Sequence, residues 1–551
     1  MTDVPTPIPD PLREVAEHVT AAAAAVRGEA GKAPAQIRLE RPKHAAQGDF
    51  STNAAMLLAP ALKMAPRPIA ERISAELASR MGEELAHTEV AGPGFLNLFL
   101  SDHWYRRALS TVASVGAQLG LGGAEPAERI LIEFVSANPT GPLVAASGRH
   151  AAYGDALARI LEHHGHTVAR EYYFNDAGNQ IRLLGASVQA RARNAEVPEG
   201  GYQGEYVREL AAAIPDAAER DVDEVARAAV DRLLAQIKTT LERYGVHFDR
   251  FFSERTLHEG EPTGVARELA QLEAAGHIYR SDDATWLRTT TFGDDKDRVV
   301  IRRSGEPTYL AADIAYLQNK RARGFQRMLV PVGSDHHAWV REMKAVAAAI
   351  GADPEALEVP LIQFVHLVSG GESAAMSKRR GEFVTLDALL DEIGVDATRF
   401  FMLRSSHDRT LDLDLDLARK QSRENPVYYV QYAHARIASM LARLNDERRS
   451  AALSPQAWGE HELEASERAL IQRLASFPDE ISEAAARRAP HRITGYAVSL
   501  AQDFTAFYEQ CRVVGATPES VESFRIALSS VAQGVIALTL SLLGVSAPDS
   551  M

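Results

Sequence analysis

The sequence predicts a multidomain protein with a small α/β unit at the N-terminus, a central α/β domain built on a parallel sheet, and an all-α helical bundle at the C-terminus. Three observations support this fold class. The chain has 551 residues, too many for one hydrophobic core, which suggests about three or four folding units. Strand-like and helix-like runs alternate through its middle, and helical periodicity dominates after about Asp391.

The first unit is expected to cover residues 1–115. An Ala-rich helix is predicted over residues 10–35. The segment EVAGPGFLNLFLS alternates apolar and small residues, like a strand that closes a small α/β unit. The Gly-rich break GAQLGLGGAEPAE then provides the first linker.

The central domain is expected over residues 116–400. Its strand-like runs alternate with helical stretches, which is the pattern of an open parallel sheet that binds ligands at the carboxyl ends of its strands. These runs are RILIEFVS, TVAREYYF, DRVVIRR, RMLVPVG and PLIQFVHLV.

The helical domain is expected over residues 401–551, where long amphipathic helices dominate. We interpret the short alternation at residues 412–420 as the entry to a helix. The most apolar late segment, VAQGVIALTLSLLGV, contains Gln and Gly and is shorter than the ~20 residues that a membrane span needs.

The composition is that of a globular protein, with 46% hydrophobic and 24% charged residues. The formal net charge of -14 disfavours a polyanionic partner at long range, but a local basic face would be sufficient to bind one. The single cysteine, Cys511, excludes an intramolecular disulfide framework and a cysteine-cluster metal site. The N-terminus lacks the pattern of a secretory signal, so we expect a cytoplasmic protein.

Two segments have the features of phosphate sites. The stretch GPLVAASGRHAAYGDALARIL follows a buried strand and turns directly into a helix, whose first N–H groups could face an anion. However, its VAAS segment offers no acid, base or cation. The loop GGESAAMSKRRGEFVTL carries Lys378, Arg379 and Arg380 after a strand; it is either a solvated basic loop or a source of cations for a triphosphate.

Five motifs, taken in their order along the chain, resemble those of a known family. The motifs are EFVSANPTGPL, NDAGNQ, PTYLAADIAY, MSKRRGEFVTL and ENPVYYVQYAHARI. Together they resemble class I aminoacyl-tRNA synthetases, and specifically bacterial arginyl-tRNA synthetases. The resemblance implies a Rossmann-type catalytic domain with an insertion at about residues 165–290, an additional N-terminal tRNA-binding domain and a C-terminal anticodon-binding domain. It also implies L-arginine, ATP, Mg²⁺ and tRNA(Arg) as substrates and partners, and a monomer.

The resemblance implies an arginine pocket. In this family the counterpart of Glu133 holds the guanidinium, and those of Ser136 and Asn138 hold the α-amino and carboxyl ends. On the helix PTYLAADIAY, Asp313 is the expected guanidinium partner, with Tyr309 as a wall and Tyr316 beside them; the alternative is an ordinary helix face. Asn138 could instead stabilise an Asn-Pro turn. The last residue assigned to this pocket is His336.

The ATP and tRNA sites follow from the same resemblance. The expected ATP-binding residues are Pro142, Gly148, Arg149, Gly333, Asp335, Met376, Ser377, Lys378 and Arg379. The expected tRNA contacts are Tyr428, Gln431, Tyr432 and Arg436, whose aromatic rings could stack on anticodon bases, although a Tyr-rich helix can also belong to a core. His336 and His337 could form a metal pair, but no third ligand is apparent, so no metal site is expected in the protein itself.

One motif departs from the family pattern. Class I synthetases carry His-x-Gly-His after the first strand, and this chain has Val144, Ala145, Ala146 and Ser147 at those positions. Losing both imidazoles removes interactions with the reacting triphosphate. Two interpretations remain. In one the enzyme is active, with Lys378, Ser147 and His150 as catalytic residues; in the other it is an inactive paralogue that binds arginine or tRNA.

Lys378 favours the active interpretation. The family loop begins Lys-Met-Ser-Lys, and this chain has Ala375 at the first lysine but retains Lys378 at the second, which is credited with catalysis. A third interpretation, an unrelated nucleotidyltransferase on the same fold, predicts that replacing Asp313 leaves activity intact. We therefore expect ATP-dependent ligation of arginine to tRNA.

Overall fold

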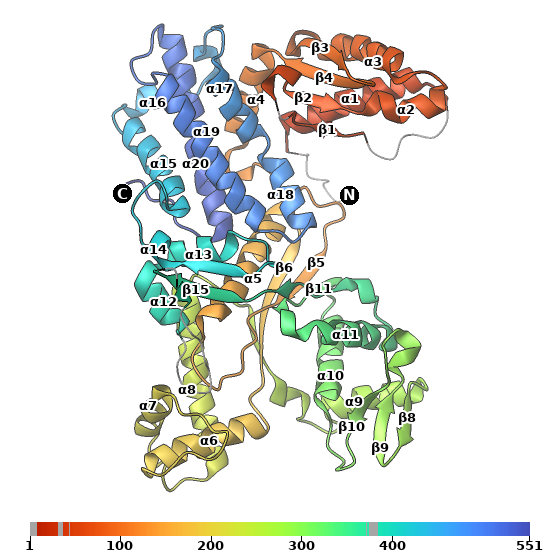
Figure 1. The fold of residues 1–551 in the computed structure, drawn as a ribbon, viewed down its shortest axis with the longest axis vertical. Helices are drawn as coiled ribbons and strands as arrows, with labels where there is room; N and C mark the ends of the chain where they lie inside the picture. The colour runs from red at the N-terminus through yellow and green to blue at the C-terminus, as the bar shows by residue number, and fades with distance from the viewer. Residues whose placement is uncertain (1–7, 31–36, 43, 371, 374–383) are drawn as a thin grey trace.

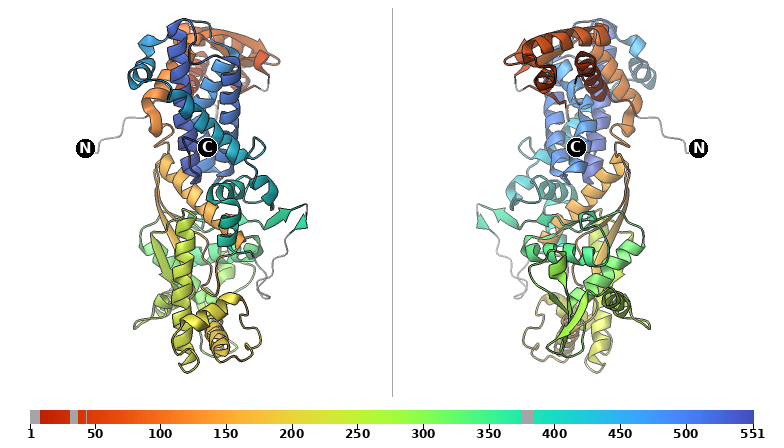
Figure 2. Two further views of the ribbon diagram at one scale, coloured as in Figure 1. Left: turned by 90° about the vertical axis from the view of Figure 1, so that its left-hand side faces the viewer. Right: turned by 90° about the vertical axis from the view of Figure 1, so that its right-hand side faces the viewer.

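The structure is a computed structural model that describes residues 8–30, 37–42, 44–370, 372–373 and 384–551. The molecule is elongated (Figures 1 and 2). The N-terminal domain and the C-terminal helices lie side by side at one end, the parallel sheet occupies the middle, and two smaller units extend from the other end. The predicted fold class, a parallel-sheet domain combined with a small α/β domain and a helical domain, is confirmed.

Five parallel strands form the central sheet, in the order β13-β11-β5-β6-β7. Their bounds are β5 Arg129–Glu133, β6 Thr167–Phe174, β7 Arg250–Ser253, β11 Arg327–Leu329 and β13 Leu357–Glu358. Ile130 and Ile132 pack in the core that includes α5 (Ala145–His164), whereas Leu131 packs in the core that includes α10 (Tyr309–Ala322). Both faces of the sheet are therefore covered, as a continuous apolar strand requires.

The N-terminal domain packs helices against a four-stranded antiparallel sheet of order β1-β2-β4-β3. The elements are α1 Pro11–Arg27, β1 Leu39–Glu40, β2 Phe50–Thr52, α2 Ala54–Leu62, α3 Pro66–Met81, β3 Leu85–Ala91, β4 Phe95–Leu100 and α4 Asp102–Val115. The first helix stops before residue 35 because Gly28 takes a φ of 58° and leaves the helical conformation. The segment EVAGPGFLNLFLS is a hairpin rather than one strand, turning at Gly92 and Gly94, both with positive φ.

Two units are inserted around β7. The first contains α6 Asn179–Ala192, α7 Glu205–Ala213 and α8 Val222–Arg243; the second contains α9 Gly264–Ala274, β8 Ile278–Ser281, β9 Ala284–Leu287 and β10 Arg298–Ile301. The run DRVVIRR was expected in the parallel sheet, but it forms β10, which pairs antiparallel with β9. Its composition indicates a strand and not the sheet to which that strand belongs, so the interpretation was wrong.

The run PLIQFVHLV also lies outside the central sheet. It forms β14 Leu361–Ile362, paired with β12 Val332–Gly333, and β15 Val365–Ser369, paired with β16 Glu372–Ser373 and β17 Leu411–Asp414. The alternation that we interpreted as a helix entry does lead into a helix, α14 (Leu415–Ala418), which Asp414 caps. Its first residues also form β17, in which Leu411 and Leu413 are buried and the aspartates between and after them are exposed. This period of two is that of a strand.

The remaining helices are α11 His337–Ala349, α12 Leu386–Ile393, α13 Val395–Leu403, α14 Leu415–Ala418, α15 Pro426–Leu441, α16 Asp446–Ala452, α17 Ala465–Ala475, α18 Phe477–Ala486, α19 His491–Gln510 and α20 Glu519–Leu543. Helix α20 is longer than the apolar segment suggested. Among the described residues it is the one helix that is long and apolar enough to cross a membrane. In the most apolar 18-residue stretch of α20, 61% is buried inside the protein. The helix packs on α15 and α19, as a core helix does.

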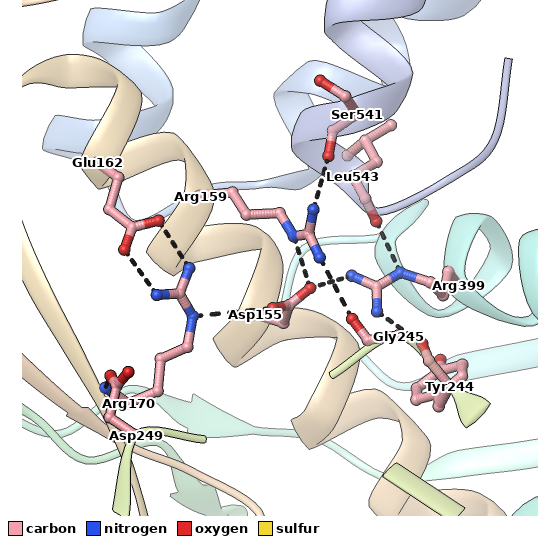
Figure 3. A network of polar contacts seen from close by, with 10 residues as sticks. All are labelled: Asp155, Arg159, Glu162, Arg170, Tyr244, Gly245, Asp249, Arg399, Ser541 and Leu543. Carbon is pink, nitrogen blue, oxygen red and sulfur yellow. Dashed lines mark hydrogen bonds and ion pairs between the residues drawn. The ribbon is translucent and has the colours of Figure 1, made fainter. Parts of the chain in front are cut away.

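A buried ion pair joins helices α5 and α13 and is linked to the last helix of the chain (Figure 3). Asp155 on α5 lies 2.5 Å from Arg399 on α13, and their side chains are 2% and 0% exposed. Arg399 also donates to the carbonyls of Tyr244, at 3.0 Å, and Leu543, at 2.9 Å. The other members of this network are Arg159, Glu162, Arg170, Gly245, Asp249 and Ser541. Four chain segments therefore meet around one guanidinium: α5, α13, the residue after α8 and the end of α20.

We expect Arg399→Met to lower the free energy of unfolding by about 3–5 kcal/mol, because it leaves two carbonyls unsatisfied and removes a cation from a buried carboxylate. Urea denaturation followed by circular dichroism measures this change. Arg13→Met, which breaks an exposed pair with Glu17, is the control and should cost under about 1 kcal/mol. Equal losses in the two variants would contradict the role assigned to the network.

Candidate active site

A cavity of about 380 Å³ lies beyond the carboxyl ends of β5, β6 and β11. The chain runs from β5 to β6 on one side and later returns to β11 on the other, so the cavity lies where open α/β sheets bind ligands. Its polar lining comes from five separate segments: Glu133, Ser136, His150, Tyr173, Asp313, Tyr316, Lys320, His336 and Trp339. The structure thus brings together most of the side chains predicted for arginine.

The chain leaves β5 through a strained turn. Val135 and Ser136 have φ values of 67° and 41°, which is rare for residues other than glycine and especially for a β-branched one. Ser136 is held by its neighbours: its N–H donates to the carbonyl of Phe134 at 2.9 Å, and its hydroxyl donates to Glu133 at 3.0 Å and accepts from the N–H of Tyr173 at 3.2 Å. Strain that is fixed in this way is typical of functional sites.

Asp313 is the most perturbed carboxyl group of the cavity. Burial raises its pKa to about 7, and the nearby carboxylates of Glu133, Glu254 and Glu342 act in the same direction. The indole N–H of Trp339, which donates to Asp313 at 3.2 Å, opposes this rise. A buried carboxyl group with an indole as its protein partner is suited to receive a cation from a ligand.

Two further carboxylates near the cavity, Glu133 and Glu171, are already paired with cations. Glu133 contacts Lys320, whose ammonium lies 4.1 Å from the ring centroid of Tyr316. Glu171 accepts from the hydroxyl of Tyr316 at 2.7 Å and from Arg323 at 2.6 and 2.8 Å. Burial opposes it, but these hydrogen bonds keep the pKa of Glu171 below its ordinary value. Of the described residues lining the cavity, Asp313 is therefore the carboxylate without a cationic partner.

His150 faces this cavity and not the predicted triphosphate turn. Burial lowers its pKa to about 4, and the adjacent Arg149 acts in the same direction. The imidazole is thus neutral at physiological pH and cannot replace a cation beside phosphate groups. Ser147 lines a different cavity, although it is only three residues away on the same helix.

Several predicted arginine residues lie at the edge of the cavity or outside it. Tyr309 is 67% exposed at the first residue of α10 and does not line the cavity, which starts one turn further along. Asn138 is exposed; its amide donates to Gln180 at 3.1 Å and its oxygen accepts from the N–H of Asn175 at 3.2 Å. Its carbonyl also accepts from Thr140, so it stabilises the Asn-Pro turn as well.

The turn into α5 lines a second, smaller cavity of about 60 Å³. Pro142, Val144 and Ser147 border it, so two positions of the missing histidine signature face this space. Val144 also bridges to Thr385, just before α12. Two tyrosines of the first inserted unit, Tyr202 and Tyr206, form the opposite wall.

Gly148 and Arg149 have structural roles that the resemblance did not suggest. Gly148 is buried, and a Cβ there would lie 2.9 Å from Leu386 on α12. Arg149 is 1% exposed and donates to the carbonyls of Gln363, Phe364 and Ser406 at 2.8–3.3 Å. Its donors are committed to backbone, so the structure does not present this side chain to a nucleotide.

The segment GSDHH divides between two cavities. Gly333 and His336 line the cavity of Asp313, and exposed Asp335 lies 3.8 Å from His336. His337 instead lines a cavity of about 650 Å³ on the other side of α11. The two histidines thus face apart at the start of a helix, and no group of three metal-ligating side chains occurs among the described residues. The predicted ATP residues Met376, Ser377, Lys378 and Arg379 lie outside the described residues.

The predicted tRNA residues lie on α15, and only some are accessible. The rings of Tyr428 and Tyr432 stack at 6.2 Å, and the Arg436 guanidinium lies 5.0 Å from the Tyr432 ring. These three are half-buried and share one helix face. Gln431 is buried and donates to Asp396 at 2.8 Å, so the structure does not present it to tRNA.

The main cavity is also lined by Lys320, Tyr173 and Trp339, which were not predicted from the sequence. Lys320 follows Tyr316 by four residues on α10, so helical spacing could have placed it on the same face. Tyr173 alternates with buried Tyr172 on β6, which also indicates the opposite face. No signal in the sequence pointed to Trp339.

Three family models match consecutive parts of the chain: "Arginyl tRNA synthetase N terminal domain" over residues 13–100, "tRNA synthetases class I (R), catalytic domain" over 112–414 and "DALR anticodon binding domain" over 430–551. A curated arginine–tRNA ligase of Frankia alni is 44% identical over 538 residues, covering 94% of this chain and 95% of that protein. One of Desulfosudis oleivorans is 43% identical, covering 98% and 100%. The solved Thermus thermophilus arginyl-tRNA synthetase is similar in fold, with a TM-score of 0.76, 22% identity, and coverage of 98% of this chain and 100% of that one.

We expect Asp313→Asn to stabilise the protein relative to the wild type at pH 8 and to have little effect at pH 4. The folded-state pKa of about 7 lies above the ordinary 3.8, so the stability linked to the buried proton is present below about pH 4 and lost as the pH rises through 7. Thermal unfolding at both pH values measures the difference. Melting temperatures that change in parallel for both proteins would refute a raised pKa.

Proposed function

The chain belongs to the arginyl-tRNA synthetase family of class I aminoacyl-tRNA synthetases, and we propose that it attaches L-arginine to tRNA(Arg) with ATP. The observation that carries this proposal is the buried carboxyl group of Asp313, which has no cationic partner among the described residues. A ligand with a permanent positive charge would complete it. The relatives named arginine–tRNA ligase favour catalysis over a non-catalytic binding protein.

Charge balance supports arginine as the amino acid. Glu133 and Lys320 offset one another, so ionised Asp313 leaves one net negative charge on these three groups. A guanidinium supplies one positive charge at any physiological pH and presents a planar fork that suits a carboxylate. Its binding would lower the pKa of Asp313 and keep the carboxylate ionised. Ser136, on the strained turn, would lie toward the α-amino and carboxyl ends.

The proposed chemistry has two steps. The carboxylate of arginine attacks the α-phosphorus of ATP, which forms arginyl-adenylate and releases pyrophosphate. A terminal ribose hydroxyl of tRNA then attacks the arginyl carbonyl carbon and AMP leaves. The described residues hold no cluster of three metal ligands, so we propose that Mg²⁺ arrives bound to the triphosphate as part of the substrate. Lys378 would offset the negative charge that develops on the phosphates.

The triphosphate end of the site differs from the family pattern because Val144 and Ser147 replace the two histidines. Ser147 lines the small cavity beside the turn and can donate one hydrogen bond there. His150, neutral and facing the amino-acid cavity, is better placed to affect arginine binding than phosphate chemistry. We therefore propose catalysis with Lys378 as its principal cation.

The helical domain would bind the tRNA. Tyr428 and Tyr432 offer stacked rings for unpaired bases, and Arg436 places a cation beside them. We also propose that the protein acts as a monomer in the cytoplasm, the compartment that holds its tRNA substrate.

The first test is attachment of labelled arginine to total tRNA by the purified protein with ATP and Mg²⁺. Lys378→Ala should slow charging by about 100-fold or more, because it removes a cation that acts on the transition state. Asp313→Asn should raise the KM for arginine, and His150→Ala should change the KM for arginine more than that for ATP. Lys420→Ala, which breaks an exposed pair with Glu424, is the matched control.

Wild-type protein that is folded and binds arginine or tRNA but charges no tRNA would overturn the ligase proposal. The VAAS segment would then mark an inactive catalytic site, and the protein would act by binding alone. Activity that persists in Asp313→Asn at an unchanged arginine KM would instead favour a different substrate on the same fold.

Replacement of Tyr432 by alanine should raise the KM for tRNA by about 10-fold, because one stacked base contributes about 1–3 kcal/mol. The KM values for arginine and ATP should remain unchanged. Tyr496→Ala in the core of the same domain reports the effect of lost packing alone. A Tyr432 variant with unchanged tRNA KM would place the anticodon contacts elsewhere.

A further inference from the structure

The first inserted unit reaches the turn where the signature histidines are missing. Tyr202 and Tyr206, just before and within α7, line the 60 Å³ cavity opposite Val144 and Ser147. The cavity is small, so it can take one small group, with the rest of a ligand outside. Its wall therefore combines the strand-to-helix turn of the sheet domain with two tyrosines from about 60 residues later in the chain.

Tyr206 fixes the backbone of the turn. Its hydroxyl donates to the carbonyl of Thr140 at 2.9 Å. Its ring also packs so closely on Gly141 that a Cβ there would lie 3.2 Å from the ring and from the hydroxyl oxygen. Burial and the neighbouring Tyr202 raise the pKa of Tyr206, so the hydroxyl stays protonated and remains a donor.

Tyr202 and Ser147, whose side chains each carry a hydroxyl group, both line this cavity. Within the described part of the chain, neither side-chain hydroxyl has a hydrogen-bond partner, although the backbone N–H of Tyr202 donates to Ser187 at 3.0 Å. The backbone of Tyr202 is held by a hydrogen bond, and its hydroxyl group is available to bind a ligand. Both hydroxyls can donate to an anionic oxygen, and neither carries charge.

The inserted unit is held in place against the site at two further points. The hydroxyl of Tyr244, just after α8, donates to the carbonyl of Gly148 on α5 at 3.3 Å. On α8 itself, Thr240 and Arg243 donate to Asp387 of α12 at 2.6 and 3.3 Å. These contacts fix the unit against α5 and α12, so the two tyrosines stay at the turn without a ligand.

We propose that this unit completes the nucleotide site: the hydroxyl of Tyr202 donates to a phosphate oxygen of ATP, and Tyr206 is a positioning residue that holds the Thr140–Gly141 turn. The inference rests on the proposed function, because it takes ATP as the ligand. Tyr202 then supplies, as a neutral donor, one of the phosphate interactions that the two signature histidines would otherwise provide. Tyr202 and Tyr206 line the same cavity as Val144 and Ser147, the two positions where the histidines are missing.

The test measures binding of ATP with Mg²⁺, and separately of adenosine, by isothermal titration calorimetry to the full chain. Tyr202→Phe should weaken ATP binding about 10-fold, as expected for losing a hydrogen bond to a charged group, and leave adenosine binding unchanged. Tyr206→Phe should weaken ATP binding and lower kcat for arginine-dependent ATP–pyrophosphate exchange, measured with tRNA present, while the arginine KM stays the same. Tyr496→Phe, which loses a comparable bond to the carbonyl of Arg473 at 2.8 Å in the helical domain, should change neither.

Each outcome decides the proposal. Equal ATP affinity in wild type and Tyr202→Phe would overturn it, as would a loss of affinity for ATP and adenosine alike, or a wild type that binds no ATP. A wild type that binds ATP through Tyr202 but charges no tRNA would refute the ligase function and leave this site in place. Should Tyr206→Phe not fold, as judged by its circular dichroism, Tyr202→Phe still decides the matter.

Discussion

The buried pair of Asp155 and Arg399 is the constraint on which the arrangement of the protein depends. A charge at 0% exposure is tolerated only when its donors are satisfied, and Arg399 satisfies them with one carboxylate and the carbonyls of Tyr244 and Leu543. Those partners belong to the sheet domain, the first inserted unit and the last helix. The pair therefore sets the position of α5, and with α5 the turn that lines the smaller cavity, relative to the last helix.

The same electrostatic logic operates on a smaller scale in the amino-acid cavity. Glu133 and Glu171 have cationic partners, whereas Asp313 is buried with an indole N–H. The protein thus holds one carboxyl group in an unfavourable environment, which costs stability as the pH rises from about 4 to 7 and favours the binding of a cation. The net charge of -14 does not oppose a tRNA partner in this arrangement, because substrate recognition depends on local groups.

The sequence predicted those features that follow from local pattern. Strand β6 matches the run TVAREYYF residue for residue, and the spacing of Asp313 and Tyr316 placed both on the cavity side of α10. Features that depend on distant partners could not be read in this way. Arg149 looked like a phosphate ligand but serves three carbonyls more than 200 residues away, and Gln431 looked like a tRNA contact but binds Asp396. Tyr202 and Tyr206, which line the cavity beside the turn into α5, were not predicted for the same reason.

The hydrogen bond from Arg399 to Leu543 also determines when the partners of Arg399 become complete during protein synthesis. Its hydrogen bond to Leu543 spans 144 residues, and a ribosome adding about 5–20 residues per second needs roughly 7–29 s to make that stretch. Throughout this interval the guanidinium lacks one of its partners, and the core around α5 lacks α20. The nascent sheet domain therefore holds its active-site residues before it can lock them in place. The hydrogen bonds of Arg399 are therefore complete only after the helical domain, which is proposed to bind the tRNA, has been made.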